Sequence, residues 1–132
     1  MSNRVRIFLD PEATTVYDPC VPEDNQNRLI RSHTCTHYSY YTCGWTIVAA
    51  AGQKFGLHFN TFSLNVGSDD SLLIYDGPNS DYNLIARLTG LSVITGDILA
   101  SGQYLHISFQ RQCSNVNGRF EIHYFTQGKL TQ

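Results

Sequence analysis

Four cysteines are the residues whose chemistry most constrains this chain of 132 residues. Cys20, Cys35, Cys43 and Cys113 form an even set at irregular spacing, and no C-x-x-C pair suggests a redox motif or a zinc knuckle. Two disulfide bonds are the simplest account, with buried free thiols as the alternative. Because disulfides persist in oxidising compartments, the cysteines predict a secreted protein. Four cysteines allow three connectivities, and their spacing does not choose among them.

Histidines flank one of these cysteines. His33, Cys35 and His37 would share one face of an extended segment and are a possible trio for a soft metal. A structural zinc site needs a fourth ligand, and Cys43 is better explained by a disulfide, so loop histidines beside a bridge are the alternative.

Three other histidines lie in segments where apolar and polar residues alternate, each at a position between two apolar residues: His58, His106 and His123. We expect all three to face solvent. If neighbouring strands bring them together, they would form a patch that becomes charged near pH 6.

Catalytic arrangements are missing from the sequence. It contains no Gly-x-Ser-x-Gly elbow, no His-Glu-x-x-His helix and no glycine-rich phosphate loop. Asp69 and Asp70 are adjacent, so in a strand they would point to opposite faces and would not act as a glycosidase pair. Asp76 is expected to shape the Asp-Gly-Pro turn. We therefore expect a protein that is not an enzyme.

Charge and hydropathy exclude two classes of partner. Nine Lys and Arg stand against 11 Asp and Glu without a basic cluster, which argues against nucleic acid. No apolar run reaches the roughly 18 residues of a membrane span, so membrane insertion is not expected. The first ten residues have no signal-peptide pattern, and we expect that the export signal of a secreted form was removed or replaced.

The elements that must position these residues are strands. Apolar residues alternate with polar ones around Trp45 and Ile47, through residues 55–60, 72–75 and 104–109, and through 119–124. Glycine- and asparagine-rich turns separate these segments. Many short strands in a chain of this length predict one all-β domain, an antiparallel β-sandwich. Arg4 to Leu9 also alternates and predicts an extra N-terminal strand, which closes a sheet edge in the same molecule or pairs with a neighbouring molecule.

The order of motifs along about four-fifths of the chain resembles the CUB domain family. The matching segments are Cys43-Gly-Trp45-Thr-Ile47, Gly52, 57–62, Asp70, 73–77, Gly90, 101–109 and 118–124. The resemblance implies a jelly-roll-type β-sandwich from an extracellular protein that recognises proteins or glycans. It places an N-terminal extension at residues 1–19, the CUB-like domain at 20–126 and a C-terminal tail at 127–132.

Departures from the family pattern concern disulfides and calcium. A second family disulfide would need cysteines near Gly67 and Thr89, and neither position has one. The resemblance suggests Cys20 paired with Cys43, which leaves Cys35 for Cys113.

Many CUB domains bind calcium with carboxylates at positions that are Asn65, Asp70 and Gln112 here. Calcium affinity falls when amides replace carboxylates, so the resemblance implies no cofactor beyond weak calcium binding. A bridge between Cys35 and Cys113 is our hypothesis for what holds this loop instead of the metal.

Aromatic residues gather just before Cys43. Tyr38, Tyr40 and Tyr41, together with His37, are predicted to bind a partner, because amphipathic rings often anchor interfaces. Alternatively, these rings cover the open end of the sandwich. The predicted function is a non-catalytic extracellular module for protein interaction or cell adhesion. The alternatives are a lectin-like module that binds glycans and a self-assembling structural protein that forms homo-oligomers.

Overall fold

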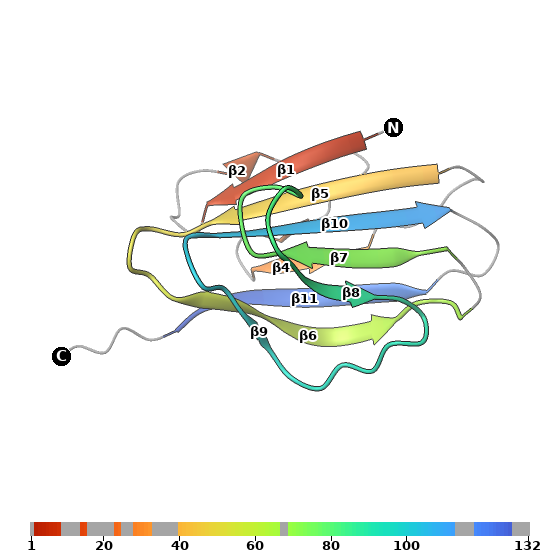
Figure 1. Ribbon diagram of the computed structural model, residues 1–132. Helices are drawn as coiled ribbons and strands as arrows, with labels where there is room; N and C mark the ends of the chain where they lie inside the picture. The colour runs from red at the N-terminus through yellow and green to blue at the C-terminus, as the bar shows by residue number, and fades with distance from the viewer. Residues whose placement is uncertain are drawn as a thin grey trace.

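The computed structural model describes residues 2–8, 14–15, 23–24, 28–32, 40–66, 69–112 and 118–127, and all of their regular elements are strands. These strands form two sheets (Figure 1). The first sheet has the order β2 (Thr14–Thr15), β1 (Ser2–Phe8), β5 (Tyr40–Val48), β10 (Tyr104–Gln112), β7 (Ser71–Tyr75) and β8 (Leu84–Leu88). The second has the order β3 (Glu23–Asp24), β4 (Leu29–Arg31), β11 (Arg119–Thr126), β6 (Phe55–Ser63) and β9 (Ile98–Leu99).

The predicted β-sandwich is confirmed, and so is the extra N-terminal strand. β1 lies inside the first sheet between β2 and β5, where Val5 is opposite Trp45. The pair of β1 and β5 is parallel, whereas every other pair among the described strands is antiparallel. A parallel pair needs a long connection, and the chain between these two strands provides it. A strand of the predicted N-terminal extension therefore belongs to the same sheet as the central strands.

The core lies between the two sheets and takes alternate residues from their strands. Trp45 and Phe109 from the first sheet both pack edge-on against Phe120 of the second, with ring centroids 6.3 and 4.8 Å apart. Each fully buried large apolar side chain contributes about 1.5–3 kcal/mol. The buried apolar residues are Ile30, Cys43, Trp45, Ile47, Ala49, Phe55, Leu57, Leu64, Leu72, Ile74, Leu105, Ile107, Phe109, Phe120, Ile122 and Tyr124.

His106 does not face solvent, so that prediction is wrong. The loop of residues 76–83 crosses the outer face of the first sheet (Figure 1) and leaves His106 only 6% exposed. The hydroxyl of Thr46 lies 2.9 Å from Nδ1 of His106 and 3.4 Å from the carbonyl oxygen of Pro78 in that loop. Strand alternation correctly places His106 away from the core, but the loop covers that face as well.

The remaining features of the fold concern its connections. Asp76, at the end of β7, accepts hydrogen bonds from the amide and hydroxyl of Ser101, at 3.2 and 2.5 Å. This carboxylate thereby ties the loop after β7 to the turn before β10.

In the described part of the chain, no helix has the length and hydropathy to cross a bilayer.

Candidate functional site

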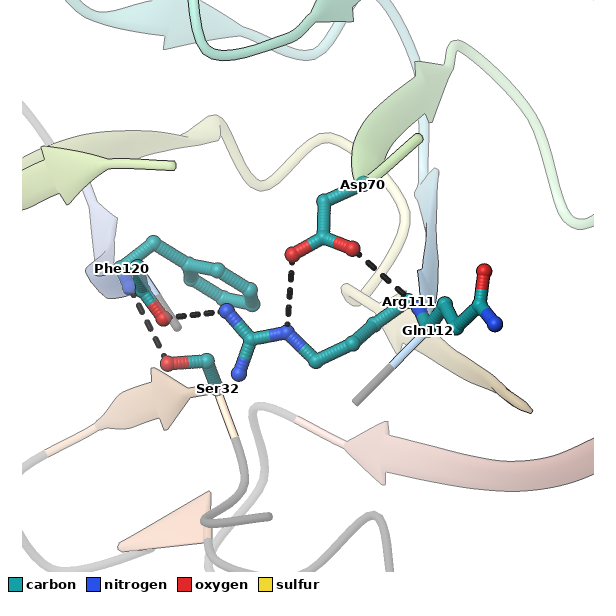
Figure 2. A network of polar contacts seen from close by, with 6 residues as sticks. Ser32, Asp70, Arg111, Gln112 and Phe120 are labelled. Atoms are coloured by element: carbon teal, nitrogen blue, oxygen red, sulfur yellow. Dashed lines mark hydrogen bonds and ion pairs between the residues drawn. The ribbon is translucent and has the colours of Figure 1, made fainter. Parts of the chain in front are cut away.

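Asp70 and Arg111 form a buried ion pair at one end of the sandwich. Nε of Arg111 lies 3.0 Å from Oδ2 of Asp70, and the two side chains are 1% and 2% exposed. Oδ1 of Asp70 accepts a second hydrogen bond, at 3.2 Å, from the backbone amide of Gln112. Figure 2 shows both contacts converging on the carboxylate. Both oxygens of Asp70 therefore already have protein donors.

The register of the first sheet explains why these two residues meet. Phe109 is opposite Leu72, and Gln110 is opposite Ser71. One more step along both strands places Arg111 opposite Asp70, and opposite charges at such a position stabilise a strand pair. Both residues also continue the parity of their strands that faces the core. The strands thus direct a carboxylate and a guanidinium into the same end of the core.

Further contacts surround the guanidinium of Arg111. Nη2 donates a hydrogen bond to the main-chain carbonyl of Gly118, just before β11. Cζ lies 5.0 Å from the ring centroid of Phe109, a cation–π distance. Ser32 joins β4 to β11 nearby, with its hydroxyl accepting from the amide of Phe120 at 3.1 Å (Figure 2). Arg111 is therefore a structural cation that links both sheets.

Among the predicted calcium ligands, Asp70 contributes the one carboxylate, and both of its oxygens accept hydrogen bonds from the protein. Calcium needs six to eight oxygen ligands. Asp70 accepts hydrogen bonds from two N–H groups, one of them on the positively charged side chain of Arg111. The backbone amide of Gln112 is the second donor, and the side chain of Gln112 is exposed. Asn65 is half-buried in the neighbouring turn. Within the described residues, no group of three or more His, Cys, Asp or Glu side chains is placed to hold a metal.

Other predicted site residues lie partly or wholly outside the described residues. Cys43 takes part in a disulfide bond, but its predicted pairing with Cys20 and the predicted bridge from Cys35 to Cys113 concern residues beyond that set. The same holds for the possible metal trio of His33, Cys35 and His37 and for Tyr38. Tyr40 and Tyr41 begin β5, but their side chains are not described. These site assignments stay predictions.

Two of the remaining histidines are neighbours on the outer face of the second sheet. His58 on β6 is opposite His123 on β11, as the histidine-patch hypothesis requires. Nδ1 of His58 lies 2.7 Å from Oδ1 of Asp97, and both of these side chains are about half exposed. The ring of His123 stacks on the ring of Phe125, with the two ring centroids 6.4 Å apart.

Exposed aliphatic side chains that the sequence did not suggest lie on β8, on β9, in the connection between them and in the turn after β6. Six aliphatic side chains are exposed there, and we call them the apolar rim: Val66, Leu84, Ile85, Leu91, Val93 and Leu99. Leu91 and Val93 are 78% and 80% exposed. They lie between β8 and β9, the edge strands of the two sheets, where the chain crosses from one sheet to the other (Figure 1).

Close backbone packing holds two parts of the apolar rim together. A Cβ atom added to Gly90 would lie 2.5 Å from the carbonyl oxygen of Asn65 and 2.7 Å from the amide nitrogen of Val66. Only a glycine lets these two turns approach so closely. Leu91 and Val66, the neighbours of these contact points, are therefore brought to the same corner of the molecule.

Sequence reasoning missed both Arg111 and the apolar rim, although the sequence contains a signal for each. Arg111 follows Leu105, Ile107 and Phe109 at intervals of two, which indicates a side chain that faces the core. Leu91 and Val93 lie in a turn-rich segment where polar residues are expected. Apolar residues in such a connection indicate either a covered loop or an exposed binding surface, and burial distinguishes the two.

Comparison with known sequences identifies related proteins. "Cubilin homolog" of Drosophila melanogaster is 32% identical over 100 residues, which are 70% of this chain and 3% of that protein. "Exoskeleton protein RP43" of Riftia pachyptila is 31% identical over 87 residues, or 64% of this chain and 20% of that protein. The chain therefore spans a small part of the relatives that it matches.

Known structures and families agree with this relationship. A solved structure of the CUB1-EGF-CUB2 domains of rat MASP-1 superposes with a TM-score of 0.53 at 17% identity, over 76% of this chain and 40% of that one. This similarity concerns the fold. The family model of the CUB domain matches residues 24–124. The chain belongs to the CUB domain family, whose members are generally extracellular modules for protein interaction.

Proposed function

We propose that this chain is an extracellular, non-catalytic module that binds a partner protein through the apolar rim. The observation that carries this proposal is the exposure of its six aliphatic side chains. Large exposed aliphatic side chains that lie close together, as the Gly90 contact places Val66 and Leu91, support an interaction site. Tyr82, in the loop of residues 76–83, is the one aromatic among the exposed large apolar side chains of the described residues. The six aliphatic side chains have neither the π face nor the hydrogen-bonding atoms that sugar recognition uses, so the apolar rim itself favours a protein partner over a glycan.

An extracellular location is supported by the chemistry of the core. Cys43 is fully buried and disulfide-bonded. Protein disulfides that hold a fold together persist in oxidising compartments. Family membership supports the same location, and we propose that the protein is secreted.

The non-catalytic part of the proposal is supported by the contacts of the titratable side chains. Asp70 is paired with Arg111, Asp76 accepts from Ser101, and His106 shares a hydrogen bond with Thr46. Each of these contacts joins segments far apart in the sequence. We propose that these groups hold the fold together.

We also propose that recognition by this module does not depend on calcium. The guanidinium of Arg111 already neutralises Asp70, the one predicted ligand that carries a charge. Calcium bound to Asp70 would place two positive charges beside the buried guanidinium of Arg111, and like charges repel strongly in such an environment. The positive charge of Arg111 therefore takes the electrostatic role of a metal at this end of the sandwich.

Calcium dependence is tested on the wild-type protein by differential scanning calorimetry and isothermal titration calorimetry. We expect the same melting temperature in millimolar calcium and in EGTA, and no binding heat above that of a magnesium control. Saturable binding of calcium together with a higher melting temperature would refute calcium independence without affecting the apolar rim.

Protein binding is tested by capture from extracellular matrix extracts. The oxidised chain is immobilised beside its Leu91→Ser/Val93→Ser variant, and captured proteins are identified before and after enzymatic deglycosylation of the extract. We expect proteins that the wild type retains, the variant loses and deglycosylation does not release. Loss of capture on deglycosylation, with binding to the same glycan on any protein scaffold, would instead indicate a lectin-like module. Capture that the variant retains in full would exclude the apolar rim.

A further inference from the structure

β8 offers an unpaired strand edge beside the apolar rim. It is the last strand of the first sheet, and among the described strands it pairs with β7 alone (Figure 1). Its outward backbone N–H and C=O groups therefore have no strand partner among the described residues. An unpaired edge of this kind is a template on which another extended segment can form hydrogen bonds.

The side chains of β8 divide between two faces. Ala86 and Leu88 are partly buried and pack against the core. Leu84 and Ile85, at the start of the strand, are 46% and 42% exposed. The register of β7 and β8 shifts at Ile85, since Ala86 is opposite Ile74 and Leu84 is opposite Tyr75, and a segment added beside β8 would cover Leu84 and Ile85 on the face that also carries Arg87. The edge thus provides apolar contacts as well as hydrogen bonds.

Arg87 gives this edge a charge preference. It is exposed, and no carboxylate forms an ion pair with it among the described residues. It is also the single charged residue of β8, so a second copy pairing through the same strand would bring another arginine and no carboxylate. A partner with Asp or Glu opposite Arg87 would form the missing ion pair, and this complementarity favours a different protein over a second copy.

We propose that β8 binds an extended segment of the partner protein as a seventh strand of the first sheet. On the outer face of the sheet the segment places a carboxylate opposite Arg87 and an apolar residue beside Leu84 and Ile85, and its intervening apolar residues lie on the face of Ala86 and Leu88. The flanking chain of the partner covers Leu91 and Val93. This proposal rests on the proposed function, and it specifies how the bound protein is recognised. Strand addition takes affinity from main-chain hydrogen bonds and specificity from alternate side chains.

The probe is a phage-displayed library of random eight-residue peptides, selected on the immobilised full-length oxidised chain. We expect enriched peptides with alternating apolar residues and an Asp or Glu. Their binding should weaken about tenfold in Arg87→Glu. The matched control is Arg119→Glu, which reverses an exposed arginine on β11 of the other sheet and should leave affinity unchanged. Selection on Arg87→Glu should instead enrich peptides that carry Lys or Arg.

Backbone pairing is tested with two synthetic versions of the best peptide, N-methylated at odd or at even positions. An added strand uses alternate amides for pairing, so one version should lose binding and the other should retain it. Hydrogen exchange should slow in residues 84–88 when the unmodified peptide binds.

The outcomes separate the two proposals. Failure of the library to enrich peptides, equal effects of both methylation patterns, or equal effects of Arg87→Glu and Arg119→Glu would overturn strand addition while matrix proteins can still bind the apolar rim. Failure of protein capture would overturn the proposed function itself. A molecular mass that doubles with concentration in light scattering, and does so less in a β8 variant, would show that a second copy occupies this edge.

Discussion

Folded proteins usually bury apolar side chains and expose charged ones, and two regions of this molecule do the opposite. One is the end of the sandwich at Asp70 and Arg111, and the other is the apolar rim. The end buries two charges, whereas the apolar rim exposes six aliphatic groups. Burying a charge costs several kcal/mol per ion unless a partner compensates it, and here the two charges compensate each other. Exposed aliphatic groups forgo about 1.5–3 kcal/mol each relative to full burial, and no contact within the described fold compensates them. The comparison supports our proposal that the apolar rim binds a partner, whereas the charged end holds the two sheets together.

Removing one charge of the buried pair should have the largest effect. Arg111→Leu leaves Asp70 buried without its cation, and we expect the free energy of unfolding to fall by about 3–5 kcal/mol in urea denaturation. The double variant Asp70→Leu/Arg111→Leu should be more stable than Arg111→Leu, because no unpaired charge remains. A loss below about 1 kcal/mol in the single variant would show that the pair does not hold this end together.

Forcing apart the two turns of the apolar rim should have the next largest effect. Gly90→Ala places a Cβ against the carbonyl oxygen of Asn65, and overpacking of this kind costs about 1–3 kcal/mol. Gly96→Ala, in the same connection, is the control, since nothing lies within 4 Å of its added Cβ. Thermal unfolding should separate the two variants. Equal stability would contradict the close packing of Gly90 on the turn of Asn65 and Val66.

An ion pair at the surface sharpens the contrast with the buried one. The amide of Asn60 and then the guanidinium of Arg31, hydrogen-bonded at 2.9 and 3.0 Å, hold the pKa of Glu121 below its ordinary value of 4.5. A lowered folded-state pKa stabilises the fold above the unfolded pKa, and this contribution disappears as pH falls through the folded one.

Because Glu121 and Arg31 are 31% and 39% exposed, solvent screens them. We expect Glu121→Gln to cost only about 0.2–1 kcal/mol at pH 7. Urea denaturation at several pH values should show the difference from wild type shrinking below the ordinary carboxyl pKa. A difference that stays constant down to strongly acidic pH would assign it to packing.

Polar substitution in the apolar rim should change stability least. Leu91→Ser/Val93→Ser removes two exposed side chains, so the free energy of unfolding should stay within about 0.5 kcal/mol of wild type. Leu72→Ala, at a fully buried position, should cost about 2–5 kcal/mol. A large loss in the double variant would mean that Leu91 and Val93 pack against the protein itself and would remove the case for a partner there.

Strand alternation predicted much of this fold but not the surroundings of each strand. The period of two that places Leu105, Ile107 and Phe109 in the core also places His106 on the opposite face, and both statements hold in the structure. Whether that opposite face meets solvent depends on residues 76–83, whose path over the sheet has no local signature. A loop is positioned by contacts such as that between Thr46 and Pro78, which join residues 32 apart.

The candidate site was less predictable than the fold. Asp70 was identified through the family resemblance, as a calcium ligand, whereas its partner Arg111 was not identified at all. The apolar rim was also missed, because the exposure of a side chain depends on which distant segments cover it in the folded protein. The disulfide pairing and the tyrosine cluster remain predictions.

The sequence by itself determined that the chain alternates with a period of two, that its motifs follow the order of a known family, and that no familiar catalytic arrangement is present. Only the tertiary structure decided that Arg111 meets Asp70, that β1 pairs in parallel with β5, and that Leu91 and Val93 stay uncovered. The physical reason is the sequence separation over which each interaction acts. Periodicity depends on residues two apart, whereas Asp70 and Arg111 are separated by 41 positions and meet only because β7 and β10 pair in one register.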